Sequence, residues 1–548
     1  MVFPSLAMVQ CASVISRKQA YTHENSLNHP VRAGPEAGSG SRTSSRIGMK
    51  TANRHGTTHG SSPTGMRQRV GLYAAPGLAL LVYLNPFSSL PPSAHVLSAI
   101  LVWVVVSWAT EAIPLAVTSL VGAALCIAMG LGSAKEVLAT FAHPIIFLFI
   151  GSFFLAEAFV VHGLDRRFAV WLLSRKKIMA RPVLMFGAMG FATAFLSMWI
   201  SNTASVAIMV PIAFGLLSTV RGSREESGSH EPGVLLLLAY GSAAGGIATM
   251  IGTPPNIIGV GLLSQQAGVD ISFFDWMAIG LPLAVVLWLG IAAILFWLHP
   301  LPTTFPDLGD HLQNLRRQQA GWTRGQKNTC FALLLAIACW IGPGVLGIAL
   351  GRDSDLVTFI NARLPKEMVP IFAAGLLFVL PLNFKAGEFT LSWSQAANIN
   401  WGTILLFGGG LTFGHLMVQT HLAEIIGEGL VALFGSNTLW TLTAVSIGTA
   451  LVITEIVSNT ASTSMLVPVV ISIATAAGVS PVPPTLGICL GASLAFMMPV
   501  ATAPNAIVYG TGFIPLPNML RAGVFLNIIG AVLVWLTLRL LCPLMGFA

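Results

Sequence analysis

The chain has 548 residues, of which 54% are hydrophobic and only 9% charged, with a mean hydropathy of +0.78. Soluble domains carry charge on about a quarter of their residues, so this composition excludes a soluble protein and indicates a membrane protein with many crossings. Residues 276–298 and 328–350 are each 23 residues without a charge, and about 20 apolar residues cross a bilayer as a helix. The apolar runs are continuous rather than alternating, which excludes a membrane β-barrel.

The net charge of +8 comes almost entirely from residues 1–69, which hold nine Lys or Arg and two Glu and so contribute +7. This tail is rich in Ser, Gly, Thr, His and Asn, which is typical of a disordered segment, and it lacks the apolar core of a signal peptide. We interpret it as a cytoplasmic topogenic arm, or as the product of a start codon assigned too early, with Met49 or Met66 as later candidates. A nucleic-acid-binding arm would also be basic, but nothing else in the sequence supports a nucleic-acid partner.

Eleven apolar runs follow the tail as predicted crossings. They cover residues 71–88, 93–112, 114–132, 143–162, 233–265, 273–298, 328–350, 367–383, 401–420, 482–512 and 519–542. Two further apolar blocks, 182–220 and 437–478, each carry the sequence SNTAS near the centre. Their limbs are slightly short for full crossings, so each block is predicted to be a re-entrant hairpin or a pair of short spans, with the polar tripeptide as a tight turn.

The two blocks are related by sequence. SNTASVAIMVPIA at 201–213 and SNTASTSMLVPVV at 458–470 share seven of thirteen residues, whereas a third SNT at 436–438 lies in a polar connection and shows that the tripeptide alone is weak. Each block is followed by a proline motif inside an apolar run, GTPPN at 252–256 and ATAPN at 501–505. Proline removes a backbone donor and breaks a helix, so the chain is predicted to contain two repeats of a hairpin and a broken helix.

Charge placement gives the orientation. The loops 163–181 and 300–328 are basic and are therefore predicted to be cytoplasmic, together with the N-terminus. The number of crossings between the two copies is then odd, which predicts an inverted repeat. In secondary transporters, helix breaks of inverted repeats converge at the membrane midplane and hold the substrate and its coupling ions.

The predicted breaks carry neutral hydroxyl and amide side chains. Free N–H groups at helix N-termini favour an anion, and free carbonyls at C-termini favour a hard cation. No Lys or Arg occurs in residues 182–220, 233–269 or 386–520, so no fixed cation could balance a bound anion. This pattern favours symport of an anion with cations. Six scattered cysteines show no CxxC pair, so neither a disulfide framework nor a structural zinc is expected.

These motifs resemble the divalent anion/sodium symporter family, which includes sodium-coupled dicarboxylate, citrate and sulfate transporters. The resemblance covers roughly residues 70–545 and rests on WATEAIPLAVTSL at 108–120, FAHPIIFLFIGSFFLAEA at 141–158, both SNT motifs, GGIATMIGTPPN at 245–256 and LAFMMPVATAPNAIVYG at 494–510. It implies an all-α polytopic homodimer with about eleven transmembrane helices and two re-entrant hairpins per protomer, in which a transport domain moves against a scaffold domain as an elevator.

The expected division of the chain is a basic tail (1–69), scaffold helices (70–180), a first transport half (181–300), a cytoplasmic loop (301–328), more scaffold helices (329–425) and a second transport half (426–548). The resemblance implies two sodium sites, one at Ser197, Ser201, Asn202 and Gly252, the other at Thr454, Val457, Asn459 and Ala501. It implies substrate contacts at Asn202, Thr203, Thr253, Ser458, Asn459, Thr460, Thr502 and Ala503. Ala503 departs from the family, where proline is usual.

The function expected from these features is sodium-coupled import of small dianions, in first place C4-dicarboxylates such as succinate, malate or fumarate, across the inner (plasma) membrane. The alternatives are a sodium-independent di- or tricarboxylate exchanger and a sodium-coupled sulfate transporter.

Neither HExxH nor GxSxG occurs, so no enzyme and no cofactor besides the sodium ions is expected, while a channel is disfavoured by the inverted repeat. Glu455, the one charge in residues 429–520, is either a proton-coupling group or a structural carboxylate bonded to N–H groups of its hairpin. The GGG at 408–410 is interpreted as a site of close helix packing.

Overall fold

The computed structural model describes residues 65–85, 90–179, 181–221, 230–301, 321–351, 353–434 and 438–548. Almost all of the basic tail and the first two residues of the third SNT lie outside this part of the chain. The described residues are helical apart from their connections and one small antiparallel ladder, β1 (Pro381–Asn383) with β2 (Glu388–Phe389). The structure therefore confirms an all-α membrane protein.

The helices follow the predicted crossings with small shifts at their ends. Before the first hairpin come α2 (Met66–Leu84), α3 (Pro92–Thr110), α4 (Leu115–Ala128), α5 (Ala134–Ala139), the 3₁₀ helix η1 (Thr140–Ala142), α6 (Pro144–Val161), α7 (Leu164–Leu173) and α8 (Lys176–Met179). The first SNTAS block forms α9 (Pro182–Ser197) and α10 (Asn202–Arg221), and the first broken helix forms α11 (Glu231–Ala248) and α12 (Pro254–Ala267).

The second part of the chain continues with α13 (Phe273–Leu298), α15 (Arg324–Leu350), α16 (Asp355–Arg363), α17 (Val369–Val379), α18 (Trp393–Ala396), α19 (Trp401–Gln419) and α20 (Leu422–Phe434). The second SNTAS block forms α21 (Leu439–Thr454) and α22 (Asn459–Ala476), and the second broken helix forms α23 (Val482–Ala492) and α24 (Ala503–Tyr509). The last helix is α25 (Leu516–Leu544).

Eight of the described helices are long and apolar enough to cross a bilayer. They include α13 and α15, which contain the two uncharged 23-residue runs. The first limb of each hairpin is shorter, because α9 and α21 have 16 residues each. A 16-residue helix rises only about 24 Å, which is less than the ~30 Å hydrocarbon thickness of a bilayer.

One segment that the sequence indicated as a loop is mostly helical. Residues 163–181 were expected to be only a basic cytoplasmic loop, but most of them form α7 and α8, and α7 buries Leu164, Val170 and Leu173. This helix packs against both limbs of the first hairpin, while α20 packs against α22 of the second. The apolar stripes of α7 and α20 are too short for a crossing, so the pattern of apolar runs does not predict these helices.

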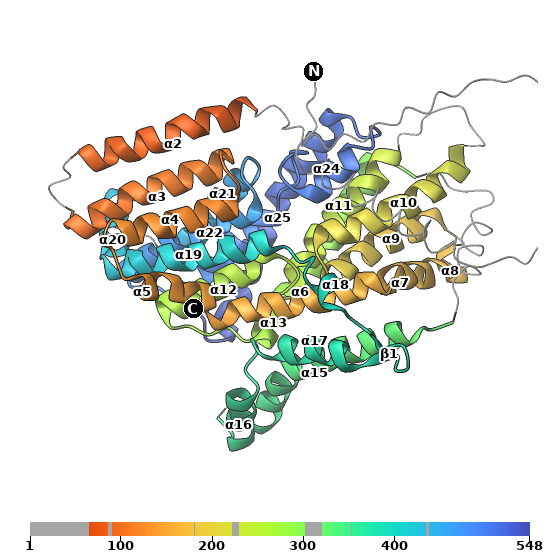
Figure 1. Cartoon of the computed structure of the whole chain (residues 1–548). Helices are drawn as coiled ribbons and strands as arrows, with labels where there is room; N and C mark the ends of the chain where they lie inside the picture. Colours follow the sequence, from red (N-terminus) through yellow and green to blue (C-terminus); the bar gives the residue numbers. More distant parts are fainter. Residues whose placement is uncertain are drawn as a thin grey trace, which may run out of the picture.

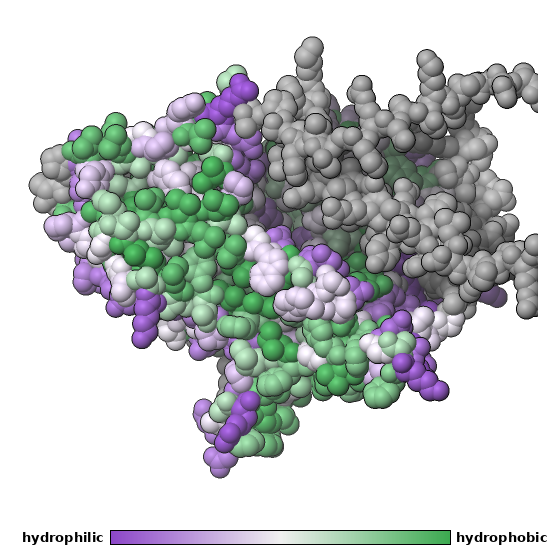
Figure 2. Space-filling model, viewed as in Figure 1, coloured by the Kyte–Doolittle hydropathy of each residue, from purple (hydrophilic) through white to green (hydrophobic). Residues whose placement is uncertain are grey.

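The helices are arranged around the two broken ones. In Figure 1, α2, α3, α4 and α19 lie together on the left, and α9, α10 and α11 lie on the right. Figure 2 shows hydrophobic residues over much of the described part of this face and hydrophilic ones mainly toward its edges. Of the spanning stretch of α11, 94% is buried, against 17% for α15, so the first helix break lies inside the protein and not against lipid.

Glycine permits the close approach of several helices. Within the GGG motif, a Cβ at Gly408 would overlap Phe141, one at Gly409 would overlap Ser119, and Gly410 faces Ser464. This is the close packing that the sequence predicted for the motif. The contact between α9 and α11 is closer still, because a Cβ at Gly245 would overlap the carbonyl oxygen of Ala194.

We predict that Gly245→Ala lowers the melting temperature of the purified protein clearly. The new methyl group meets backbone atoms, which cannot rotate away, and overpacking of this kind costs about 1–3 kcal/mol. Gly290→Ala on α13 is the matched control, because nothing lies within 4 Å of its Cβ position. An equal melting temperature for both variants would contradict the close contact.

Candidate functional site

The two SNT motifs begin helices. Ser201 immediately precedes α10, and its Oγ accepts a hydrogen bond from Ala204 N (3.2 Å); Ser458 caps α22 in the same way, with its Oγ accepting from Ala461 N (3.3 Å). Serine is a preferred N-cap because its oxygen satisfies a free N–H of the first turn. The expected tight turn is thus corrected: the four residues 198–201 and 455–458 make the turns, and Asn202, Thr203, Asn459 and Thr460 already lie in the returning helices.

The hydroxyl four residues before each SNT contacts the asparagine of that motif. Ser197 Oγ donates to Asn202 Oδ1 (2.6 Å), and Thr454 Oγ1 donates to Asn459 Oδ1 (2.8 Å). Both hydroxyl residues are fully buried, whereas the asparagines are half-buried. The same pair of oxygen atoms therefore occurs once in each hairpin, at its tip.

The first hairpin tip contacts the first helix break. Thr249 Oγ1 donates to Met198 O (2.6 Å). A Cβ at Gly252 would lie 3.0 Å from Ser197 O, and one at Gly246 would lie 2.6 Å from Asn202 Oδ1. The structure thus brings together Ser197, Asn202 and Gly252, three of the four residues expected at the first sodium site, and Ser201 lies in the same turn.

The residues expected at the second sodium site are connected differently. Thr454 and Asn459 are in contact, and Val457 and Ala501 are both buried with 6% exposure. Ala501 N donates to Met498 O (3.2 Å), and Met498 N in turn donates to Glu455 Oε2 (3.0 Å). The tip and the break of the second half are therefore joined through the side chain of Glu455.

An asparagine closes each break. Asn256 Nδ2 donates to Gly246 O (2.9 Å) and Thr249 O (2.8 Å); Asn505 Nδ2 donates to Ala495 O (2.8 Å) and Met498 O (3.1 Å). The separations along the chain are ten and seven residues in both cases. The two breaks thus share one geometry, in which an amide after the break replaces the N–H donors that the preceding helix has lost.

The remaining predicted anion contacts lie at helix starts. Thr253 and Thr502 are the N-caps of α12 and α24, both in extended conformation, and Thr502 Oγ1 accepts from Asn505 N (3.3 Å). Ala503 is the first residue of α24 and offers only its backbone. The four helices α10, α12, α22 and α24 all begin at these motifs, and helix N-termini carry partial positive charge. Each of these helix starts therefore favours a nearby anion.

Glu455 is held by three donors. Its Oε1 accepts from Met497 N (3.0 Å) and Asn527 Nδ2 (2.7 Å), and its Oε2 accepts from Met498 N (3.0 Å). The residue is buried, with 8% exposure. This geometry favours the structural carboxylate among the two sequence interpretations, although its N–H partners belong to the helix break and not to the hairpin.

Three further residues contact the breaks or the second hairpin turn and were not found from the sequence. Asn527 contacts Glu455 from α25. Trp276 Nε1 of α13 donates to Ile247 O (3.1 Å), and Tyr240 OH of α11 donates to Phe496 O (2.6 Å). No motif marks these residues, since each lies on an ordinary apolar helix, far along the chain from the carbonyl or carboxylate that it contacts.

Comparison with known proteins identifies the class. The sequence pattern of the sodium:sulfate symporter transmembrane region matches residues 68–546, so the chain belongs to the sodium:sulfate symporter family and is a multi-pass membrane protein. It is 33% identical over 491 residues to the sodium-dependent dicarboxylate transporter SdcS of Staphylococcus saprophyticus, covering 87% of this chain and 92% of that protein. An uncharacterized transporter of Haemophilus influenzae is 32% identical over 461 residues, covering 83% and 93%.

The fold also resembles that of a solved transporter structure. MtrF of Neisseria gonorrhoeae, reported as one of a class of antimetabolite efflux pumps, superposes with a TM-score of 0.50 at 13% identity, covering 84% of this chain and 97% of that one. At this identity the likeness concerns the fold alone.

We predict that Glu455→Gln lowers the stability of the purified protein by about 1.5–3 kcal/mol, the contribution of hydrogen bonds to a charged group. The glutamine amide would turn an N–H donor toward Met497 N or Met498 N, which are themselves donors. Thermal unfolding in detergent measures the loss. Glu424→Gln is the control, since that side chain is 70% exposed and its pair within the described residues is His421 (3.0 Å). A stable Glu455→Gln protein whose uptake had lost its pH dependence would favour proton coupling instead.

Proposed function

We propose that the chain is a secondary active transporter that carries small dianions, in first place C4-dicarboxylates, together with sodium ions. The observation that carries the proposal is the twice-repeated hydroxyl and asparagine pair at a hairpin tip beside a broken helix. The sequence relation to sodium-dependent dicarboxylate transporters supports both the ion and the substrate class.

The anion would bind between the helix starts. Asn202, Thr203, Asn459 and Thr460 are half-buried, so they are within reach of a solute, and amides and hydroxyls can donate to carboxylate oxygens. The N-termini of α10 and α22 add N–H groups and positive potential. A dianion at such a site still lacks a full counter-charge, which explains why transport would require co-bound cations.

The sodium ions would bind on the opposite side of each tip. Ser197 Oγ and Asn202 Oδ1 in the first half, and Thr454 Oγ1 and Asn459 Oδ1 in the second, are neutral oxygen atoms of the kind that hard cations prefer. Backbone near Gly252 and near Val457 and Ala501 would complete the two shells. Two such sites would provide two positive charges, enough to neutralise one dianion.

The mechanism proposed is an elevator, in which the two hairpins, the two broken helices, α13 and α25 move together. The glycines of α19 support it, because Gly410 faces Ser464 of α22, and a Cβ at Gly414 would overlap Gln266 of α12. A surface without side chains lets the neighbouring helices lie close and offers few obstacles to sliding. We further propose a homodimer in the plasma membrane, with the N-terminus in the cytoplasm.

Uptake into proteoliposomes tests the function. With purified protein, labelled succinate should accumulate steeply when an inward sodium gradient is imposed, and unlabelled malate or fumarate should compete. Uptake that needs an internal carboxylate but no sodium would identify the exchanger. Competition by sulfate but not by dicarboxylates, still with sodium, would identify the sulfate transporter. Protein-free liposomes and a potassium gradient are the controls.

Removal of each hydroxyl tests the two cation sites. We predict that Ser197→Ala and Thr454→Val each raise the sodium concentration for half-maximal uptake about 10-fold, since one ligand near a cation contributes roughly 1.5 kcal/mol or more. Ser446→Ala and Thr443→Val are matched controls, because within the described residues their hydroxyls donate to carbonyls of their own helix, Leu442 O (2.7 Å) and Leu439 O (2.8 Å). Equal sodium dependence in all four variants would exclude these sites.

A further inference from the structure

In both helix breaks, the backbone carbonyl at an equivalent position accepts a hydrogen bond from an aromatic side chain. Ile247 lies nine residues before Asn256, and Phe496 lies nine residues before Asn505, so the two carbonyls occupy equivalent positions. Trp276 Nε1 donates to Ile247 O (3.1 Å) and Tyr240 OH donates to Phe496 O (2.6 Å). Trp276 and Tyr240 are almost fully buried, at 2% and 0% exposure. The donors differ in chemistry and come from different helices, but the bond is the same.

This carbonyl is one of several backbone carbonyls at the break, each of which either accepts a hydrogen bond from the protein or faces a cation. At a break, several C=O groups lose their N–H partners, and each carries a partial negative charge that either accepts a donor or faces an ion. The asparagine of each break donates to two neighbouring carbonyls, one residue before and two residues after the carbonyl bound by the aromatic side chain. These are the carbonyls of residues 246 and 249 in the first break and of residues 495 and 498 in the second. With the aromatic donor, three carbonyls of each break have fixed directions.

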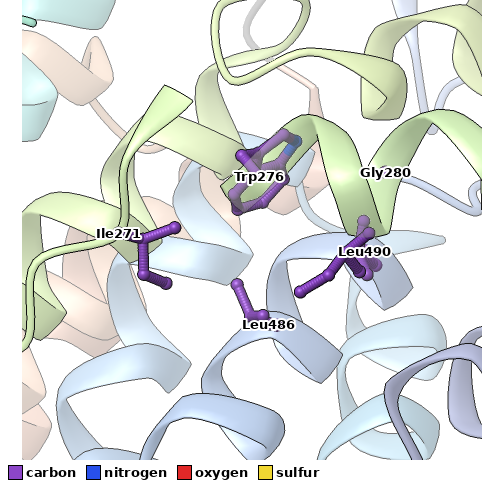
Figure 3. Close-up of a pocket in the computed structure, with 6 residues that line it drawn as sticks. Ile271, Trp276, Gly280, Leu486 and Leu490 are labelled. Carbon is purple, nitrogen blue, oxygen red and sulfur yellow. The ribbon is translucent and has the colours of Figure 1, made fainter. Parts of the chain in front are cut away.

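The carbonyl at Ile247 lies beside a mainly apolar pocket of the described residues. Figure 3 shows Trp276 of α13 beside Leu486 and Leu490 of α23, around a small pocket whose lining is otherwise Ile271, Ile279 and Gly280. A Cβ at Gly280 would overlap Ile247 O, so the cavity wall lies against this carbonyl. Without the indole N–H, the oxygen would face apolar groups and would be driven to turn toward another partner.

The second break is held from both sides. Tyr240 fixes Phe496 O, while Glu455 accepts the N–H groups of the next two residues, Met497 and Met498. Residues 496–498 lead directly to Ala501 and Thr502. Tyr240 itself belongs to α11, which forms the first break, so one side chain ties the second break to the helix of the first.

We propose that Trp276 and Tyr240 are positioning residues that set which backbone carbonyls face the coupling cations, Trp276 for the cation beside Ser197 and Tyr240 for the cation beside Thr454. The inference rests on the proposed sodium-coupled function and assigns roles to residues that bind neither substrate nor ion. Loss of either donor lets its carbonyl turn, which changes the geometry of one cation site and leaves the anion contacts of the tips unchanged.

The test is the sodium dependence of succinate uptake by Tyr240→Phe and Trp276→Phe. Each variant should raise the sodium concentration for half-maximal uptake about 5-fold or more, as expected for one lost bond at a buried acceptor. The succinate KM at saturating sodium should change less than about twofold, because substrate contacts are retained. Trp340→Phe is the matched control, since its indole donates to Lys366 O (3.0 Å), a carbonyl of neither break, and Tyr83→Phe on the exposed surface of α2 is the second.

Double variants assign each donor to its site. Tyr240→Phe should be additive with Ser197→Ala and non-additive with Thr454→Val, and Trp276→Phe should show the reverse, because only groups that share a site couple. For variants too inactive to assay, the sodium-induced rise in melting temperature of the purified protein gives the same comparison.

The outcomes separate the two proposals. Wild-type uptake without any sodium dependence overturns the proposed function and this inference together. Normal sodium dependence in the wild type, with sodium affinities of both variants within about twofold of it, overturns the inference alone. A fall in melting temperature with unchanged sodium affinity likewise overturns it, since the two side chains would then serve stability only.

Discussion

The structure depends on one constraint, which is that a helix interrupted inside a membrane protein must find partners for the backbone groups it exposes. An unsatisfied carbonyl or N–H group in an apolar interior costs several kcal/mol. Both breaks meet this requirement with the same device, an asparagine that reaches back to two carbonyls. Burial of α11 agrees with this constraint, since 94% of its spanning stretch lies inside the protein.

The two halves share geometry but not chemistry. At equivalent places between tip and break, the first half joins Met198 O to the hydroxyl of Thr249, and the second joins the carboxylate of Glu455 to the N–H of Met498. One contact is neutral and the other carries a negative charge. If the two tips hold cations, the second therefore lies in a more negative field than the first, so the two sites need not have equal affinity for sodium.

Much of this architecture could be predicted from the sequence, because crossings, breaks and hairpins each depend on residues that are close together along the chain. Proline within an apolar run marks GTPPN and ATAPN as breaks, and the repeated SNTAS motif marks the two hairpins. The contacts of Tyr240, Trp276 and Asn527 could not be predicted, since they join residues 256, 29 and 72 positions away from their partners. The turn itself was misplaced, because the serine was interpreted as part of a loop and not as an N-cap.

The hydroxyl at each tip has one proton, and where that proton goes decides whether the site can accept a cation. Thr454 Oγ1 lies within hydrogen-bond distance of two acceptors, Asn459 Oδ1 (2.8 Å) and Ala492 O (2.7 Å), and a hydroxyl donates to one acceptor at a time. With its proton directed at Ala492 O, the lone pairs of Thr454 and the free Asn459 oxygen can face an ion together. Within the described residues, the bond from Ser197 is directed at Asn202 Oδ1, so a cation there would have to displace that proton. In the proposed mechanism, sodium therefore binds more readily at the second site. Binding at the first site requires the Ser197 hydroxyl to give up its hydrogen bond, and the bound substrate and the second ion help to offset that free-energy cost.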